Sequence, residues 1–425
     1  MLNPNIVSRL RDAVRSNPNV SEFEGYHIAR CPVAVGMMGS VTCIGSEPIW
    51  RGRMRPPEAI FGEPVDSSML HGIGDYEILV PEKKIFLARR ASIIGNSAVL
   101  VGDGSLLSPD FFGSNDNIKK TLSANLSNRQ GYILEESKEG EFIAYYVSRK
   151  NQNNIPMRVL FFHNIEPGNY GSFLFRQLPQ MFLFQKFDIK FDAYVVPDRT
   201  AWWREALSLA HMPERPVYTV SEVCGDIFDE VVCVNGFDAE GFMSASTMAQ
   251  IREVAIQNYG YAATPDRLRH LAGRLSASDA HDEGRKIYVS RDLSSISRPH
   301  YRPLINENEI KDCFVSRGFE IVCPETLTLR AQIDLFRSAR CVAGPSGSGM
   351  LNSLFCTPKS RILDIEHFHV TVRQHAKVYA SADQDYAFLF GLPDPEDHRA
   401  NLVRRWHVPV ERVMPAIDWL LGRTA

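Results

Sequence analysis

The sequence predicts an α/β protein, and two observations support that prediction. From residue 156 onward, short apolar runs typical of strands alternate with helical runs, an order that indicates parallel sheets covered by helices. A polar stretch at 266–284 interrupts this alternation, which restarts after it. We therefore expect two Rossmann-like lobes, 151–265 and 285–400, joined by a linker at 266–284.

A β-rich extension precedes the two lobes. Residues 1–150 are rich in β-forming residues and are punctuated by Gly, Asn, Asp and Pro, which is typical of short strands and tight turns. No chemistry can be assigned to this extension from its residues. The strands that we expect in it are Tyr76–Val80, Lys84–Leu87, Ser92–Ile94, Ala98–Val101 and Glu141–Val147.

The composition excludes several classes of protein. The chain has 425 residues, 47 of them basic and 50 acidic, so it is long enough for two domains and has no net charge that favours nucleic acid. Its eight cysteines form no C-x-x-C pair, which disfavours zinc ribbons and thioredoxin-like chemistry. No apolar run approaches the roughly 18 residues that a membrane span needs, and the N-terminus lacks a secretory pattern. We expect a cytoplasmic protein without a transmembrane segment. Peripheral membrane association and oligomerisation are both compatible with this sequence.

The first lobe begins with an apolar run at 157–162 and a helical run at 172–187. Pro179 is expected to kink this helix or to force it to restart. His163, Glu166 and Asn169 stand between the two runs, at the end of the predicted strand. They are therefore the best local candidates for acceptor contacts or for a general base, although each is also common as a turn or cap residue.

The second lobe has the clearer alternation. Gly318 is expected to end one helix as a C-cap, and Thr326 or Thr328 is expected to cap the next. The final helical run, 411–421, belongs to a segment at 401–425 that we expect to pack back toward the first lobe. The strands expected in this lobe are 286–290, 319–322, 341–343 and 361–365, and its helices are 306–317 and 327–338.

A glycine-rich turn follows the third of these strands. Gly344, Gly347 and Gly349 surround Ser346 and Ser348, and a helical-looking segment, 350–355, comes next. Glycines permit positive φ and a close backbone approach, and a helix that starts after such a turn directs free N–H groups at a phosphate. The turn therefore predicts an anion site, but glycines that serve only packing would leave the same pattern.

Cationic side chains occur near the same edge of the predicted sheet. Arg291 ends the first strand of the lobe, and Arg298, His300 and Arg302 follow in a loop. The carboxyl ends of parallel strands are where such sheets bind ligands, and a guanidinium grips a diphosphate in a bidentate way. Clustered cations are costly without an anion. Glu366, at the end of the last strand, is placed to accept hydrogen bonds from ribose hydroxyls.

A metal site is the alternative use of this edge. His367, His369 and His375 lie close to Asp364 and Glu366 in sequence. An H-x-H pattern without a further carboxylate pair is a weak metal signal, and solvated or buried histidines are more common. We therefore expect neither a metal nor a cofactor.

These segments resemble family 61 glycosyltransferases, nearest to the bacterial members that act in capsular polysaccharide biosynthesis. The resemblance covers 285–366 well, 155–260 loosely and 1–150 poorly. Its motifs here are Ser290-Arg291, Arg302 with Asn306-Glu307, Gly318-Phe319 with Pro324-Glu325, Gln332-Ile333, and Gly344–Gly349 with Asn352 and Phe355. Asn169-Tyr170, Phe173-Leu174 and Leu178-Pro179 form the looser part.

This resemblance implies a GT-B-like architecture and inversion at the anomeric carbon without a bound catalytic metal. A nucleotide-diphosphate sugar would be the donor, a glycan the acceptor, and surface polysaccharide assembly the process. The resemblance implies that the acceptor side includes Asn169, Tyr170, Ser172 and Arg176. The donor contacts that it implies are Arg291, Arg298, Arg302, Asn306, Glu325, Ser346, Gly347, Ser348, Gly349, Asn352 and Glu366.

The sequence also departs from the family pattern. Many relatives have a histidine and an acid where this chain has Ser172 and Arg176, and a histidine where it has Ser346. The general base is therefore open among His163, Glu166 and Asp198. A catalytically impaired GT-B-fold subunit that binds nucleotide or glycan is the main alternative function. A dinucleotide enzyme is disfavoured because the turn lacks G-x-G-x-x-G order.

Overall fold

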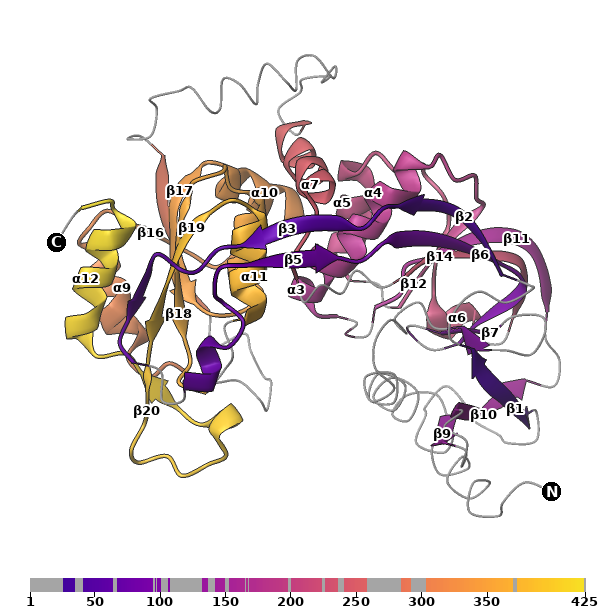
Figure 1. Ribbon diagram of the computed structural model, residues 1–425, viewed down its shortest axis with the longest axis horizontal. Helices are drawn as coiled ribbons and strands as arrows, with labels where there is room; N and C mark the ends of the chain where they lie inside the picture. The colour runs from indigo at the N-terminus through magenta and orange to yellow at the C-terminus, as the bar shows by residue number, and fades with distance from the viewer. Residues whose placement is uncertain are drawn as a thin grey trace. The chain divides into compact units, whose positions relative to one another are not determined.

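Figure 1 shows the computed structural model of the protein, whose residues fall into two compact units. Unit 1 comprises Met1–Ile49, Pro81–Trp203 and His211–Asp238; unit 2 comprises Trp50–Val80, Arg204–Ala210 and Ala239–Ala425. The structure describes residues 26–34, 41–63, 67–94, 96, 98–100, 106–107, 132–136, 142–149, 153–164, 166, 168–197, 200–223, 226–235, 241–257, 284–291, 303–369 and 373–423.

This division differs from the boundaries expected from the sequence. Residues 50–80, expected in the N-terminal extension, group with unit 2, and unit 2 resumes at Ala239, before the expected linker. Of the expected linker, only Gly284 is described. The helix at the end of the expected first lobe, α7 (Ala245–Gln257), packs against elements of unit 2. The alternation of strands and helices does not reveal these exchanges, because they join segments that are distant in sequence.

Unit 1 is built around parallel strands in the order β13-β12-β11-β14. Strands of the N-terminal segment extend this sheet, because β6 pairs antiparallel with β14, and β2 with β6. These strands of the extension are therefore continuous with unit 1 and do not form a separate body. The strands are β2 (Val41–Glu47), β6 (Lys83–Ile94), β11 (Asn154–Phe161), β12 (Ala193–Val196), β13 (Val217–Thr219) and β14 (Ile227–Val234).

Further strands continue the sheet of unit 1 beyond β6. They are β7 (Ala98–Leu100), β8 (Leu106–Leu107), β1 (Tyr26–Ala34), β10 (Phe142–Arg149) and β9 (Tyr132–Glu136). The two runs expected at 84–87 and 92–94 form one strand, β6. Helices α5 (Trp202–Leu209) and α6 (Val220–Val223) lie between the parallel strands in sequence.

The predicted helix at 172–187 is interrupted, as the position of Pro179 requires. Helix α3 (Tyr170–Ser172) leads into a π-helical segment, Phe173–Gln177, and then into α4 (Leu178–Lys186), where Pro179 occupies the first turn. Proline has no N–H to donate and is tolerated there. The π-helical segment absorbs the change of register, which is a device often found at functional sites.

Unit 2 contains a sheet of six parallel strands in the order β16-β15-β17-β18-β19-β4. Strand β4, from the N-terminal segment, completes its edge. Figure 1 shows α9 and α12 on one face of this sheet and α10 and α11 on the other. The strands are β4 (Ala59–Phe61), β15 (Arg285–Val289), β16 (Glu320–Val322), β17 (Ala339–Pro345), β18 (Arg361–Glu366) and β19 (Asp385–Phe390).

The helices of unit 2 begin and end largely where the sequence predicts. Helix α9 (Glu307–Val315) is closed by Gly318, whose φ is +81°, and α10 (Leu329–Arg337) is capped by Thr328, whose side chain accepts from the amide of Ala331. Strand β19 and helix α11 (Arg373–Ser381) were not expected. Outside the main sheet lie β3 (Trp50–Met54) with β5 (Tyr76–Val80), and β20 (Leu392–Pro393) with β21 (Trp406–His407).

The last helix, α12 (Val410–Leu420), corrects one expectation. It was expected to pack back toward the N-terminal lobe, but its buried residues Val413, Ile417 and Leu420 belong to the core of unit 2. There they pack with Leu363 and Ile365 of β18. The apolar stripe of α12 thus covers the sheet that immediately precedes it in sequence. Among the described residues, no helix has the length and apolar character needed to cross a bilayer.

Candidate functional site

The order of strands in unit 2 marks one point on the sheet as a candidate ligand site. From β15 the chain adds β16 on one side, and it then returns to add β17 on the other side. In open parallel sheets, ligands bind at the carboxyl ends of the two strands where this direction reverses. The two loops at this point carry Ser290-Arg291 and Ser346–Gly349, the residues that the sequence singled out.

Arg291 and the glycine turn are in contact. A Cβ atom added at Gly347 would lie 2.8 Å from Nη2 and 3.0 Å from Cζ of Arg291. The guanidinium therefore lies directly against the backbone of the turn. Within the described part of the chain, the amides of Gly347 and Gly349 donate no hydrogen bond. A cation beside free amides is the arrangement that binds an oxyanion.

The glycines of this turn are required for space and not for unusual backbone angles. The glycines with positive φ in the described residues do not include Gly344, Gly347 or Gly349, so the expectation of positive φ here was wrong. A Cβ at Gly344 would collide with the carbonyl oxygen of Val289 on the neighbouring strand. A Cβ at Gly349 would lie 3.2 Å from Cγ1 of Val289. The close approach of this segment to Val289 explains why glycine stands at 344 and 349.

The helical segment after the turn has the expected bounds but is not an α-helix. It is a 3-10 helix of six residues, Met350–Phe355. A helix of this length contributes little dipole, so the expected anion site would depend on Arg291 and on the amides of the turn. Asn352 is fully buried and its side-chain nitrogen donates to Gln332 Oε1 at 2.8 Å. Asn352 therefore ties this segment to α10 in the described structure.

A buried carboxylate holds Arg291 in place. Glu307, only 4% exposed, accepts from Ser290 Oγ at 2.9 Å and from the Arg291 amide at 3.3 Å through the same oxygen, Oε1. Lys311 Nζ lies 3.6 Å from Glu307. The sequence pointed to Glu307 only as part of the Asn306-Glu307 motif of the family resemblance. Its actual contacts fix the backbone that carries the guanidinium.

The other residues expected to bind the sugar donor either have structural contacts, are exposed, or lie outside the described residues. Both polar atoms of the Asn306 side chain bond to the backbone of Val408, at 2.8 and 3.0 Å, so Asn306 joins two chain segments. Glu325 is exposed on the short helix Pro324–Thr326. Arg298 and Arg302 lie outside the described residues.

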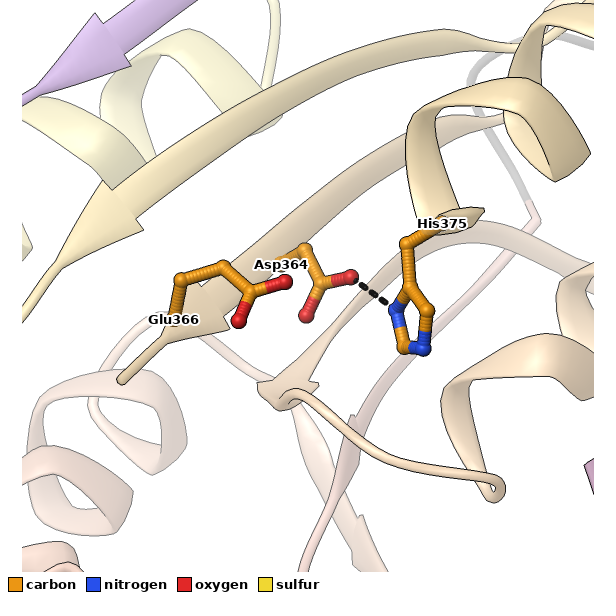
Figure 2. A group of neighbouring side chains, drawn as sticks. All are labelled: Asp364, Glu366 and His375. Atoms are coloured by element: carbon orange, nitrogen blue, oxygen red, sulfur yellow. Dashed lines mark hydrogen bonds and ion pairs between the residues drawn. The ribbon is translucent and has the colours of Figure 1, made fainter. Parts of the chain in front are cut away.

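A second polar group occupies the neighbouring strand. Asp364 and Glu366 of β18 are 0% and 1% exposed, and His375 Nδ1 of α11 lies 2.6 Å from Asp364 Oδ2. Figure 2 shows the carboxylate of Asp364 between the ring of His375 and the carboxylate of Glu366. The sequence placed these three residues close together only along the chain. His367 and His369, considered with them, do not join the group.

Tyr379 completes this network. Its hydroxyl donates to Asp364 Oδ2 at 2.6 Å, one helical turn after His375. Burial, together with the negative charge of Asp364, raises the pKa of Tyr379 well above its usual value. The phenol therefore stays protonated and donates. Ser346 Oγ lies 3.5 Å from His375 Nδ1, which places the network beside the glycine turn.

In unit 1 the equivalent reversal of strand order lies between β11 and β14. His163 follows β11 there, but it is 2% exposed and its Nε2 lies 2.7 Å from the carbonyl oxygen of Val234 at the end of β14. His163 thus bridges two strand ends from a buried position. A general base must reach its substrate, so this geometry disfavours His163 in that role.

The residues after His163 form a more accessible polar group. Glu166, whose side chain is 51% exposed, pairs with Arg176 at 3.2 Å. Arg176 also donates to Ser172 Oγ at 3.2 Å, and Ser172 donates to the buried side chain of Asn164 at 2.8 Å. The sequence offered Glu166 as a candidate base, and the family resemblance placed Ser172 and Arg176 on the acceptor side. Asn164 was missed, because asparagine after a strand most often belongs to a turn.

The remaining residues of the expected acceptor side have local roles. Asn169 caps α3 by accepting from the amide of Ser172 at 3.3 Å. The ring of Tyr170 packs edge-on against Trp202, with centroids 5.2 Å apart. Asp198 lies outside the described residues.

Comparison with known proteins finds a family model that matches part of this chain. The family model described as Glycosyltransferase 61 matches residues 170–363. The matched segment starts at α3, after Glu166, and contains Arg291 and the glycine turn; it ends one residue before Asp364. No curated protein matches the chain.

Proposed function

Since this chain belongs to glycosyltransferase family 61 through residues 170–363 and is a glycosyltransferase, we propose that it uses a nucleotide-diphosphate sugar. The acceptor is a hydroxyl group of a glycan, the transfer inverts the anomeric carbon, and the product contributes to a surface or capsular polysaccharide. We also propose that unit 2 binds the donor and unit 1 the acceptor, as in GT-B enzymes.

The contact between Arg291 and Gly347 is the observation that carries the donor assignment. It occurs where strand order reverses, which is the expected place for a nucleotide. A guanidinium and two backbone amides can together bind the two phosphate groups of the donor. Negative charge builds up on this diphosphate as its bond to the sugar breaks. Hydrogen-bond donors that are already in position therefore stabilise the transition state.

The proposed reaction is a single displacement. The acceptor oxygen bonds to the anomeric carbon while the bond from that carbon to the diphosphate oxygen breaks, and the acceptor proton passes to a base. Glu166 is the described candidate with an accessible carboxylate, and Arg176 orients it. In this proposal Arg291 and the amides of the turn, not a metal ion, take up the charge of the departing diphosphate.

A nucleotide-binding experiment tests the donor site. We expect UDP, GDP or another nucleoside diphosphate from a panel to raise the melting temperature of the full chain. Arg291→Ala should remove most of this shift and Arg291→Lys should restore only part of it, because lysine lacks the bidentate fork. Arg285→Ala is the matched control: this arginine stands at the opposite end of β15, paired with exposed Glu320, and should leave the shift intact. If no nucleotide stabilises the wild type, the donor assignment is lost.

A kinetic experiment tests the base. Glu166→Gln should lower kcat by about 100-fold or more, the usual contribution of a general base, while nucleotide binding stays unchanged. Asp188→Asn removes an exposed carboxylate elsewhere in unit 1 and should have no effect. Unchanged turnover in Glu166→Gln would assign the base to another residue. Nucleotide binding without transfer to any glycan acceptor would support the alternative of a binding subunit.

A further inference from the structure

Two carboxylates are buried side by side on strand β18. Asp364 and Glu366 are two positions apart, so both side chains project from the same face of the sheet, the face opposite Leu363 and Ile365. Both are at most 1% exposed. Two ionised carboxylates repel each other strongly where water cannot screen them. The pair is therefore stable only with a proton or a cation close by.

One oxygen of Asp364 lacks a partner. His375 and Tyr379 both bond to Oδ2, whereas Oδ1 is buried and has no hydrogen-bond partner among the described residues. Among those residues, Asp364 forms an ion pair only with His375. Figure 2 shows the carboxylate of Glu366 pointing toward Asp364, whose own carboxylate faces His375. Leaving a buried carboxylate oxygen unsatisfied is costly, and a cation bound beside it would remove that cost.

The three side chains are spaced like the ligands of a metal ion. One donor atom each from Asp364, Glu366 and His375 lies within 4.8 Å of the others. Ligand atoms on one tetrahedral zinc ion, at about 2.0–2.2 Å from it, are about 3.3–3.6 Å apart, so side-chain movements of roughly 1 Å would close the site. Two carboxylate oxygens and one imidazole nitrogen suit zinc and similar divalent ions better than Mg²⁺ or Ca²⁺.

From this geometry we infer that Asp364, Glu366 and His375 bind one divalent transition-metal ion, with Zn²⁺ preferred over Mg²⁺. The ion neutralises the buried carboxylates and ties β18 to α11. Tyr379 is the outer partner that orients Asp364, as hydrogen-bonded groups behind metal ligands commonly do. The site takes no part in the proposed transfer step, and it lies beyond the segment that matches the family model. The sequence argued against a metal because only the fold brings α11 over β18.

Metal binding by the full chain tests this inference. After treatment with a chelator and dialysis, titration with ZnCl₂ should show one high-affinity site per chain, and MgCl₂ should compete poorly. Zn²⁺ at about 100 times its Kd should raise the melting temperature by about 5 °C. Asp364→Asn and Glu366→Gln should each weaken Zn²⁺ binding at least about tenfold.

A histidine pair supplies the matched control. His375→Gln should also weaken binding, whereas His367→Gln should bind Zn²⁺ like the wild type, because His367 lies outside the group although it is buried nearby. Equal binding by the wild type and His375→Gln would overturn the inference, as would equal loss in both histidine variants.

The visible spectrum of the Co²⁺-loaded wild type provides a test that needs no variant. Oxygen and nitrogen ligands give weak d–d bands only, whereas an intense thiolate band would assign the metal to a cysteine site and overturn the inference. Failure of the wild type to bind Zn²⁺ would overturn it as well. None of these results depends on nucleotide binding, so failure here and failure of the donor site can be told apart.

Discussion

Substitution by alanine should have different effects at two glycines of the same turn: at Gly344 it should lower stability, and at Gly347 it should weaken nucleotide binding. At Gly344 a Cβ would lie 2.9 Å from Cβ of Val289 and would also meet the carbonyl oxygen of that residue. Carbon atoms pack at about 3.5–4.0 Å, so β15 and β17 would have to separate by roughly 0.6 Å or more. Both strands are central and paired in register, and overpacking of this kind costs about 1–3 kcal/mol. Gly344→Ala should therefore lower the melting temperature by about 3–10 °C.

At Gly347 the obstacle is the end of a flexible side chain. The added methyl group would displace the guanidinium of Arg291, which lies 2.8 Å away and can rotate. The free energy of unfolding should change by less than about 0.5 kcal/mol, as for most surface substitutions. Nucleotide binding should weaken by about tenfold, because a charge-assisted contact to phosphate contributes about 1.5–3 kcal/mol and part of it is lost.

Urea denaturation and nucleotide titration of both variants measure these effects. Gly74→Ala is the control, because a Cβ there meets nothing within 4 Å and should change neither quantity. A Gly344→Ala variant as stable as the wild type would refute the steric reasoning. A Gly347→Ala variant that binds nucleotide normally would show that the position of the guanidinium does not matter for the donor.

Three further predictions concern stability. Thr328→Ala should cost about 1 kcal/mol in urea denaturation, because it removes the cap on the Ala331 amide, and Thr328→Ser should cost less. Gly318→Ala should cost about 1 kcal/mol from its φ of +81° alone, since a Cβ there meets no atom; Gly318→Asn, which tolerates this conformation better, should measure closer to the wild type. The pKa of Tyr379 is higher in the folded state than in the unfolded state. Below the unfolded pKa of about 10 the phenol is neutral in both states, so its ionisation does not affect the free energy of unfolding. Above that pH the phenol ionises in the unfolded state first, so the free energy of unfolding falls as the pH rises. Melting temperatures measured from pH 9 to 11.5 should therefore fall less steeply for Tyr379→Phe than for the wild type; equal slopes would contradict this.

The sequence predicted the local elements of the second lobe because each has its own signal. Gly318 and Thr328 end and begin helices for reasons contained in a few neighbouring residues. Strand β4 has only three residues and pairs with β19, which is more than 300 positions away in sequence. No local pattern specifies such a pairing, and the exchange of residues 50–80 into unit 2 was missed for the same reason.

The candidate site was partly predictable on the same grounds. Arg291 and Gly347 could be placed together because each follows a strand of one parallel sheet, and both strand ends carried a signal. The D-x-E pattern of Asp364 and Glu366, and the spacing of His375 and Tyr379 by one helical turn, were visible in the sequence. Their meeting was not, because it requires α11 to cover the face of β18 from which the carboxylates project.

Strand order also explains why similar positions in the two units have different roles. His163 follows β11 and Arg291 follows β15, and each of these is the strand of its unit at which the direction of strand addition reverses. Beside His163 the end of β14 presents the carbonyl oxygen of Val234, 2.7 Å away, which accepts from the ring and buries it. Beside Arg291 the loop presents Gly347, which has no side chain to take up the guanidinium. The residue opposite therefore decides whether a polar side chain at this position bonds to the neighbouring strand end, as His163 does, or lies against the backbone of a turn, as Arg291 does.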